Sequence, residues 1–305
     1  MRDAFINSLL QEARIDSNIV LITGDLGFGV LETFQKELPN QFINSGINEQ
    51  TMMGLAAGFA STGKKVFVYS IGNFPTLRCL EQIRNDVCLM NNSVVIVSVG
   101  AGYSYGSQGY THHALEDVAV LRALPNIDIV VPCDPIETTQ LTKMLISTTK
   151  PAYLRLGKSN EEAIHSTPPV IEFGKAVEII KGVDGTLIFS GAIGKMVLLA
   201  EKKLSELGIS VSVTSLAFIS PIDSEYLKQA AELGPIVVVE EHSFRGGLGS
   251  AILESLNYEG INAKVGIIAA NQNQISQIGD QNFLRRENGI SVENIIEKFH
   301  FLQAN

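Results

Sequence analysis

The sequence lacks tryptophan altogether and has few charged residues for its length. Of its 305 residues, 18% are charged and 45% are hydrophobic, a composition typical of a folded chain and not of a disordered one. No apolar run reaches the roughly 18 residues that a membrane-spanning helix needs. The first residues resemble neither a signal nor a transit peptide. We therefore expect a cytoplasmic protein with no membrane partner.

Cysteine, histidine and basic residues are also scarce. The three cysteines, Cys79, Cys88 and Cys133, are widely spaced in apolar surroundings, which favours reduced core residues over a disulfide set or a metal site. The five histidines lack the spacing of metal ligands, so we expect no zinc site in this chain. A net charge of −9 argues against nucleic acid as a partner, because phosphate binding requires a basic face.

The hydrophobic pattern predicts two α/β domains. Residues 1–157 alternate helical segments with apolar strands, and Val94–Val99 is a nearly continuous apolar run, as in a parallel strand covered on both faces. Residues 158–170 are polar, contain Pro168-Pro169 and predict a linker. Residues 171–305 repeat the pattern of the first part. We expect two domains, each a mostly parallel sheet with helices on both faces.

The expected elements follow from the apolar periodicity. In the first domain we expect helices over residues 2–13, 30–38, from Glu49 onward, 76–90, 115–124 and 136–146. Strands are expected there over residues 19–23, 65–69, 94–99, 127–131 and 152–156, with a short strand at 42–43. In the second domain we expect strands over 186–189, 210–213 and 236–239, and helices over 196–207, 224–231 and 250–256.

The most informative residue is Glu49, which follows a Ser45-Gly46 turn and opens a helix that is apolar nearly all round. Such a helix is expected to be buried, and a buried glutamate is costly unless another group answers its charge. A helix start also favours a carboxylate, so a structural role is the alternative. Gly54 and Gly58 would each weaken the helix by about 1 kcal/mol unless a neighbour packs closely against them. A functional site at Glu49 is therefore a competitive hypothesis.

A long glycine-rich loop follows the strand at Val94–Val99. The loop covers residues 100–109 and leads into Thr111, His112 and His113. Ligands of open parallel sheets bind outside the carboxyl ends of the strands, and long ordered loops are often functional. His112 is therefore a candidate catalytic residue, whereas His113 is expected to face elsewhere.

Taken together, these features resemble the C-terminal half of transketolase, that is, its pyrimidine-binding domain and its C-terminal domain. The resemblance covers essentially the whole chain and implies thiamine diphosphate as cofactor, which supplies the carbanion chemistry while the protein orients it. The segments that carry it are Gly46-Ile47-Asn48-Glu49-Gln50, Glu81-Gln82-Ile83-Arg84-Asn85-Asp86, Thr111-His112 through Glu116-Asp117 to Pro125-Asn126, Glu240-Glu241-His242-Ser243 and Gly246-Gly247-Leu248-Gly249.

The resemblance assigns cofactor-binding roles to four residues. Glu49 matches the catalytic glutamate that hydrogen-bonds a ring nitrogen of the cofactor's aminopyrimidine. Phe74 matches the aromatic residue that stacks on this ring, and Tyr69 is expected in the same pocket. Asp25 matches an acidic residue near the cofactor. Read without the resemblance, Phe74 would be a core residue and Asp25 a capping residue.

Four further residues are expected to contact substrate. His112 matches a histidine that contacts substrate oxygen atoms, consistent with proton transfer. Arg2 and Arg155 match arginines that hold the phosphate of sugar phosphates, for which the guanidinium fork is suited. Either arginine could instead be an ion-pair partner. Gln108 stands where the family loop usually carries a carboxylate that reads a sugar hydroxyl.

The chain also departs from the family pattern. The loop histidine that contacts phosphate in the family falls near Gly100, and Gly27-Phe28-Gly29 replaces a serine-containing segment. An altered acceptor pocket around a retained glutamate predicts ketol-type chemistry on an unusual substrate rather than ordinary pentose-phosphate exchange.

A second departure predicts a partner subunit. The family binds the diphosphate through magnesium held by a Gly-Asp-Gly motif, and the nearest strings here, Gly24-Asp25-Leu26 and Gly279-Asp280-Gln281, lack its final glycine. We therefore expect one chain of a split enzyme. Its partner would be an N-terminal transketolase subunit that carries the diphosphate and Mg²⁺ domain. The assembly would be a homodimer of heterodimers, a heterotetramer.

Three functions remain open at this point. The first is transfer of a two-carbon ketol unit from a ketose to an aldehyde, sugar or sugar-phosphate acceptor. The second is a decarboxylating reaction of a 2-oxo acid, as in deoxyxylulose phosphate synthase or the β subunit of pyruvate dehydrogenase. The third is a non-catalytic regulatory or scaffold subunit.

Overall fold

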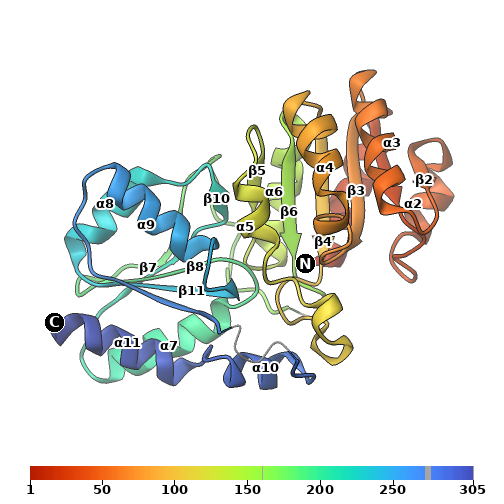
Figure 1. Ribbon diagram of the computed structural model, residues 1–305. Helices are drawn as coiled ribbons and strands as arrows, with labels where there is room; N and C mark the ends of the chain where they lie inside the picture. Colours follow the sequence, from red (N-terminus) through yellow and green to blue (C-terminus); the bar gives the residue numbers. More distant parts are fainter. Residues whose placement is uncertain (160, 272–275, 305) are drawn as a thin grey trace.

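The computed structural model describes residues 1–159, 161–271 and 276–304 and consists of two mixed, mostly parallel sheets (Figure 1). The seven-stranded sheet has the order β10-β5-β6-β4-β3-β1-β2, and the five-stranded sheet has the order β12-β11-β8-β9-β7. Strands β10 and β5 pair antiparallel, as do β7 and β9, whereas the other paired strands of the described residues run parallel. The predicted fold class is confirmed. None of the described helices is long and apolar enough to cross a membrane.

The first sheet and its helices follow the predicted order closely. The strands are β1 (Ile19–Thr23), β2 (Phe42–Asn44), β3 (Lys65–Ile71), β4 (Val94–Val99), β5 (Asp128–Val130), β6 (Ala152–Leu156) and β10 (Phe218–Ser220). The α-helices are α1 (Arg2–Ala13), α2 (Glu32–Glu37), α3 (Glu49–Ser61), α4 (Leu80–Gln82), α5 (Asp117–Arg122) and α6 (Pro135–Ser147). The helix expected over residues 76–90 is instead a 3₁₀ turn (Leu77–Cys79), then α4, then a π-helix (Ile83–Leu89).

The second sheet contains elements that the periodicity did not reveal. Its strands are β7 (Val177–Ile180), β8 (Thr186–Phe189), β9 (Ser212–Ser215), β11 (Ile236–Ser243) and β12 (Val265–Ala270). Its helices are α7 (Gly194–Glu206), α8 (Ser224–Leu233), α9 (Leu248–Tyr258), α10 (Gln281–Glu287) and α11 (Val292–Ala304). The strand expected at 210–213 begins two residues later, and β7, β12, α10 and α11 had no prediction.

Helices cover both faces of the first sheet. Alternate strand residues point to opposite faces, so Leu21 packs with α1 and α6, while Ile22 packs with α3 and the π-helix. This burial on both faces explains why the parallel strands are almost entirely apolar. The second sheet is covered in the same way, by α7 and α11 on one face and by α8 and α9 on the other.

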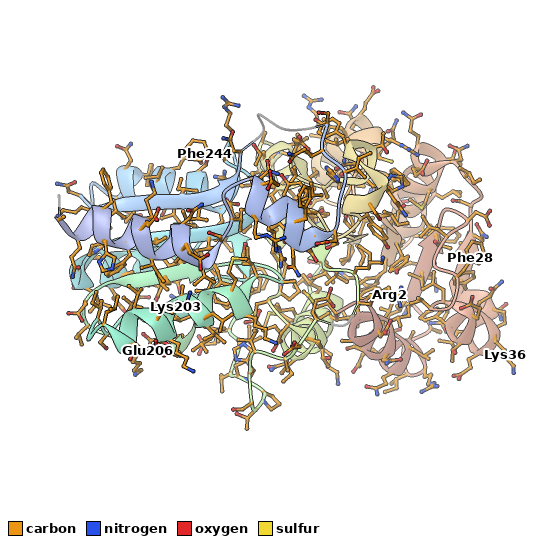
Figure 2. All side chains as sticks on the ribbon, turned by 90° about the horizontal axis from the view of Figure 1, so that it is seen from below. Arg2, Phe28, Lys36, Lys203, Glu206 and Phe244 are labelled. Carbon is orange, nitrogen blue, oxygen red and sulfur yellow. The ribbon has the colours of Figure 1, made fainter. Side chains whose placement is uncertain are left out.

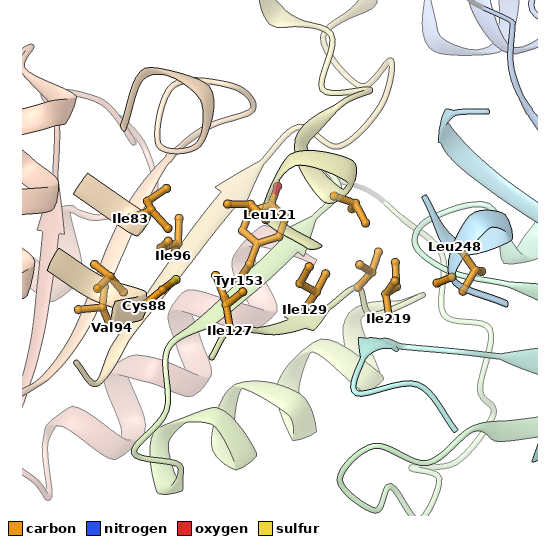
Figure 3. Close-up of a cluster of buried hydrophobic side chains, with 14 of the residues drawn as sticks. Ile83, Cys88, Val94, Ile96, Leu121, Ile127, Ile129, Tyr153, Ile219 and Leu248 are labelled. Atoms are coloured by element: carbon orange, nitrogen blue, oxygen red, sulfur yellow. The ribbon is translucent and has the colours of Figure 1, made fainter. Parts of the chain in front are cut away.

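The two domains share one continuous core. Strand β10 lies in the part of the chain assigned to the second domain, yet it pairs with β5 of the first sheet. One cluster of buried side chains includes residues of both domains, and Figure 3 shows some of its members, from Ile96 past Ile129 to Ile219 and Leu248. The boundary at residues 158–170 stays a prediction, and β10 shows that the second part of the chain also completes the first sheet.

The prediction that α3 is buried nearly all round is wrong. Met52 and Met53 are fully buried, but Gly54, Leu55 and Gly58 lie on an exposed face of the helix. An added Cβ at Gly54 or Gly58 would meet nothing within 4 Å. Apolar composition predicts burial, but it does not tell whether the same chain or another one covers the helix. Within this chain, one apolar side of α3 is exposed.

Candidate active site

The candidate site lies at the carboxyl edge of the first sheet. Strand β2 lies on one side of β1 and β3 on the other, so the chain reverses its direction across the sheet between β1 and β3. Crevices at such switch points are the usual ligand sites of open parallel sheets. The segments that leave β1, β2, β3 and β4 carry Asp25, Glu49, Phe74 and His112, respectively. The fold therefore delivers these four predicted residues to one edge.

Glu49 is the first residue of α3 and is buried, with 8% of its surface exposed. The side chain of Asn48 accepts a hydrogen bond from the Thr51 backbone N–H at 3.3 Å and thereby caps the helix. The cap function is thus filled by Asn48, and Glu49 is free for another role. Its Oε1 accepts a hydrogen bond from Nη1 of Arg78 at 3.0 Å.

Arg78 links Glu49 to Phe74 and was not anticipated from the sequence. Its Cζ lies 3.9 Å from the centroid of the Phe74 ring, and its side chain is 51% exposed. A flat group that donates N–H bonds is thus stacked on an aromatic face and bonded to a buried carboxylate. The one sequence signal was a cation four residues after an aromatic residue, which is too common to single out.

His112 continues this row of side chains. Its ring centroid lies 5.2 Å from that of Phe74 and 6.4 Å from that of Tyr105, in edge-to-face arrangements. Desolvation by burial, together with the charges of Arg78 and His113, lowers the pKa of His112 below its usual value. The imidazole is therefore neutral at pH 7 and can accept a proton. His113 instead is buried, with Nε2 3.2 Å from the Gly106 carbonyl.

The glycine-rich loop is held in place by the second domain. Glu241 of β11 accepts a hydrogen bond from the Tyr103 backbone N–H at 2.6 Å and pairs with Arg285 of α10. Gly100 has φ +97, and a Cβ there would lie 2.3 Å from the Tyr105 ring. This close approach excludes a histidine at position 100, which accounts for that departure from the family pattern.

The structure does not support the predicted substrate contact of Arg155. Its side chain is 4% exposed, and its Nε donates to Asp117 Oδ2 at 2.7 Å. Its Nη2 donates to the carbonyls of Ala114 and Glu241 at 2.6 and 3.1 Å. These bonds commit the guanidinium to the protein interior, so we assign Arg155 a structural role.

Tyr69 is likewise a core residue and not part of the pocket. It is 2% exposed, and its ring stacks on that of Phe5 in α1, with centroids 6.2 Å apart. The alternation along β3 turns Tyr69 toward α1, away from the edge where Phe74 and Glu49 lie. The resemblance placed the residue at the correct strand but on the wrong side of the sheet.

The remaining predicted residues lie at the rim. Asp25 is exposed at φ +54 and exchanges hydrogen bonds of 2.9 and 3.1 Å with Asn44, which join the ends of β1 and β2. Arg2 pairs with Asp3 at 3.0 Å and lies on the first domain (Figure 2). Gln108 is exposed at the end of a 3₁₀ turn. Their predicted contacts stay predictions, and Lys158, whose Nζ lies 4.8 Å from the Tyr105 ring centroid, joins them as a further cation.

Comparison with known proteins shows the family to which both parts of the chain belong. Residues 1–162 match the family described as "Transketolase, pyrimidine binding domain", and residues 174–295 match "Transketolase, C-terminal domain". The chain is 41% identical over 260 residues to one of the subunits of apulose-4-phosphate transketolase from Phocaeicola vulgatus, covering 84% of this chain and 83% of that protein.

Two further similar proteins are a split transketolase and an enzyme whose chain is about twice as long as the part that matches. A solved "split gene transketolase, inactive beta4 tetramer" superposes with a TM-score of 0.89 at 32% identity, covering 99% of this chain and 97% of that one. The 1-deoxy-D-xylulose-5-phosphate synthase of Heliobacterium modesticaldum is 33% identical over 302 residues, covering 95% of this chain but 45% of that protein.

Proposed function

This chain belongs to the transketolase family, and we propose that it is the C-terminal subunit of a two-chain enzyme that transfers a two-carbon ketol unit. The donor would be a ketose and the acceptor an aldehyde, sugar or sugar phosphate. The observation that carries the proposal is the Glu49 carboxylate, buried at the sheet edge and bonded to a flat donor that stacks on Phe74.

The family implies thiamine diphosphate, and the residues at this edge fit its aminopyrimidine. The Arg78 guanidinium is planar, donates N–H bonds to Glu49 and covers the Phe74 face, properties that an aminopyrimidine ring shares. For a ring to stack there, the half-exposed Arg78 side chain must turn away. When bound, the cofactor supplies the carbanion chemistry of the reaction.

The chain's own residues would orient the reactants and move protons. Glu49 would hold a proton at the ring nitrogen it faces, in a buried position that water does not compete for. His112, whose pKa is lowered chiefly by burial, would accept a proton from a substrate hydroxyl. Gln108 would read a sugar hydroxyl, and Arg2 and Lys158 would offer positive charge to a phosphorylated substrate.

An apolar face next to Glu49 supports a partner subunit. Ile47, two residues before Glu49, is 80% exposed, Leu55 of α3 is 39% exposed, and Leu77 beside Arg78 is 40% exposed. Phe28, which extends at the edge of the first domain in Figure 2, is 78% exposed. Apolar groups gathered at one site mark an interaction surface.

We infer that an N-terminal transketolase subunit covers this face and supplies the diphosphate and Mg²⁺ site. The sequence contains no Gly-Asp-Gly string, and the similar Phocaeicola protein is itself named as one subunit of a transketolase. Two copies of each chain would form a heterotetramer. The three free cysteines fit a reducing, cytoplasmic setting.

The decarboxylating alternative has a specific observation in its favour, the match to deoxyxylulose phosphate synthase. Assay of the assembled enzyme with a ketose donor and with pyruvate separates the two reactions. Turnover with pyruvate and none with ketoses would replace ketol transfer by decarboxylation.

The direct test is capture of the chain from its own cells, followed by reconstitution with the chain that co-purifies stoichiometrically. We expect a partner with a Gly-Asp-Gly motif and ketol transfer by the pair. Glu49→Gln should lower kcat by about 10²-fold or more, as loss of acid–base catalysis does, with assembly unchanged. Glu12→Gln, a surface change on α1, is the matched control. Full activity of Glu49→Gln would point to a non-catalytic subunit.

A further inference from the structure

A second cluster of reactive side chains lies away from the active site, where the linker meets the start of α6. Cys133 lies just before α6, Glu137 lies in its first turn, and His165 comes from the linker. One ligand atom from each of the three residues lies within 4.8 Å of the other two. Cys133 and Glu137 are buried and His165 is largely buried, so the cluster is not a chance grouping of surface charges.

The three side chains converge through one atom. The Nε2 of His165 lies 3.0 Å from Glu137 Oε1 and 3.8 Å from Cys133 Sγ. A ring nitrogen carries at most one proton and serves one acceptor well, whereas a metal ion can bind sulfur, nitrogen and oxygen together. Bond lengths of about 2.0–2.3 Å around a tetrahedral zinc put ligand atoms about 3.3–3.6 Å apart. The two observed separations lie on either side of this range.

The surrounding residues hold the cluster in place. Asp134 Oδ2 accepts hydrogen bonds from the backbone N–H groups of Ile164 and His165 at 2.8 and 3.1 Å, which ties the linker to α6. Glu137 Oε2 accepts from the Cys133 backbone N–H at 2.8 Å. Helix capping explains these bonds, but it does not explain why Glu137 Oε1 and Cys133 Sγ both face His165 Nε2.

Charge points to a cation at this position. Asp134 and Glu137 are both 0% exposed. The Glu137 carboxylate pairs with the His165 ring, whereas the Asp134 carboxylate accepts hydrogen bonds from the backbone N–H groups of Glu137, Ile164 and His165. One buried carboxylate thus faces an imidazole and a thiol, and a divalent ion could bind all three groups while balancing the carboxylate charge.

We propose that Cys133, Glu137 and His165 bind a divalent transition-metal ion of the zinc class, with water as the fourth ligand. Mixed sulfur, nitrogen and oxygen ligands suit this class of ion. Cys133 also lines a cavity of about 320 Å³, through which an ion and water can enter. The ion would fasten the linker to the first domain, independently of the ketol transfer proposed above.

The proposed site runs against the expectation, drawn from the sequence, that the chain binds no zinc. The sequence did not indicate the site, because His165 follows Glu137 by 28 residues and comes from a different segment. Ligands on a helix start and a linker form no recognisable motif, and only the fold brings them together.

Metal content of the full chain, purified with its partner, tests the proposal. After dialysis against Zn²⁺ and then metal-free buffer, we expect about one zinc per chain in addition to any Mg²⁺. Cobalt substitution should add a thiolate-to-cobalt charge-transfer band. Cys133→Ser and His165→Gln should each weaken zinc binding by about 10-fold or more.

Cys88→Ser provides the matched control, because Cys88 is also a buried free cysteine. It should leave zinc content and the cobalt band unchanged. Zinc in fewer than about one chain in ten, or equal uptake by Cys133→Ser and Cys88→Ser, would overturn the proposal. If Cys133→Ser does not fold, as judged by circular dichroism, His165→Gln and the cobalt band decide the question.

Discussion

At the scale of single residues, burial decides what a charged side chain does, and Arg155 is the clearest case. Asp117 is fully buried, and although burial opposes its ionisation, Arg155 and His242 lower its pKa. We expect Arg155→Met to lower the free energy of unfolding by about 3–5 kcal/mol at pH 7, because it leaves a buried carboxylate without its counter-charge. Urea denaturation measures this loss.

The pH dependence follows from the direction of the Asp117 shift. A carboxyl whose folded-state pKa is lowered contributes stability above its unfolded value, and loses it as pH falls through the folded one. The stabilising contribution of the pair in the wild type should therefore be full at pH 7 and decline below about pH 4. In Arg155→Met, burial is no longer opposed by Arg155 and should raise the Asp117 pKa, so the difference between the two proteins should begin to shrink at a higher pH. Arg14→Met, which removes an exposed pair with Glu37, should cost at most about 1 kcal/mol. If Arg155→Met left the stability unchanged and raised the KM for a phosphorylated substrate, Arg155 would have the phosphate-binding role after all.

The family resemblance singled out Glu49, Phe74 and His112, and the fold brings the segments that carry them to one edge of the sheet; their roles stay predictions. The sequence did not reveal the contacts of Arg78, because they depend on how close the 3₁₀ turn at Leu77–Cys79 lies to the start of α3. It misplaced Arg155 and Tyr69 for a related reason: a residue type and a strand position do not tell which side of the sheet a side chain occupies. The sequence indicated which residue types could take part in the chemistry, but it did not indicate which of those side chains are buried in the core.

A second prediction at this scale concerns the protonation of His112. Burial and the Arg78 charge lower its pKa, so the imidazole is neutral above that value and protonated below it. Arg78→Gln removes one of the three causes, which are burial and the charges of Arg78 and His113, and should raise the pKa toward the usual value for histidine. Histidine NMR titration of the full chain measures the shift, with His112→Gln to assign the resonance. Arg84→Gln, an exposed change, should leave the titration in place; a shift equal in both variants would argue against a specific Arg78 effect.

At the scale of elements, α3 shows that an apolar helix can face another chain. Gly54 and Gly58 have ordinary helical backbone, and an added Cβ would meet nothing within 4 Å. Gly54→Ala and Gly58→Ala should therefore each raise the free energy of unfolding of the isolated chain by about 1 kcal/mol. The same changes should weaken association with the partner, because a Cβ would stand where a neighbouring helix approaches.

A gain in stability of the isolated chain together with a loss of affinity for the partner would show that this face of α3 is a docking face and not only exposed to solvent. Denaturant unfolding gives the first quantity and titration calorimetry with the partner gives the second. Gly63, which follows the helix at φ +89, is the matched control: Gly63→Ala should destabilise the chain because alanine resists this conformation. If both α3 variants bound the partner as tightly as the wild type, the interface would lie on another face of the chain.

Element order was largely predictable, because the strands of both sheets are apolar runs bounded by polar turns. Three of the elements that were missed or called differently have identifiable physical reasons. Strand β12 is half-exposed at a sheet edge and β10 has three residues, so neither shows a strong period. The π-helix before Met90 differs from an α-helix in hydrogen bonding and not in residue type.

At the scale of the whole molecule, the continuous core predicts that neither half folds alone. A chain cut after residue 170 would lack β10, which leaves β5 as an unpaired edge, and it would lack Glu241, which holds the glycine-rich loop. Exposed strand edges and uncovered apolar core lead to aggregation. We expect residues 1–170 and 171–305, expressed separately, to be insoluble, and the full chain to unfold in one calorimetric transition. A protease site inserted at Ser166-Thr167, which are exposed, is the control: after cleavage, the two halves should stay together in gel filtration. A monomeric, cooperatively folded fragment of residues 1–170 would show instead that β10 and the shared core are dispensable, and that the two domains are independent folding units.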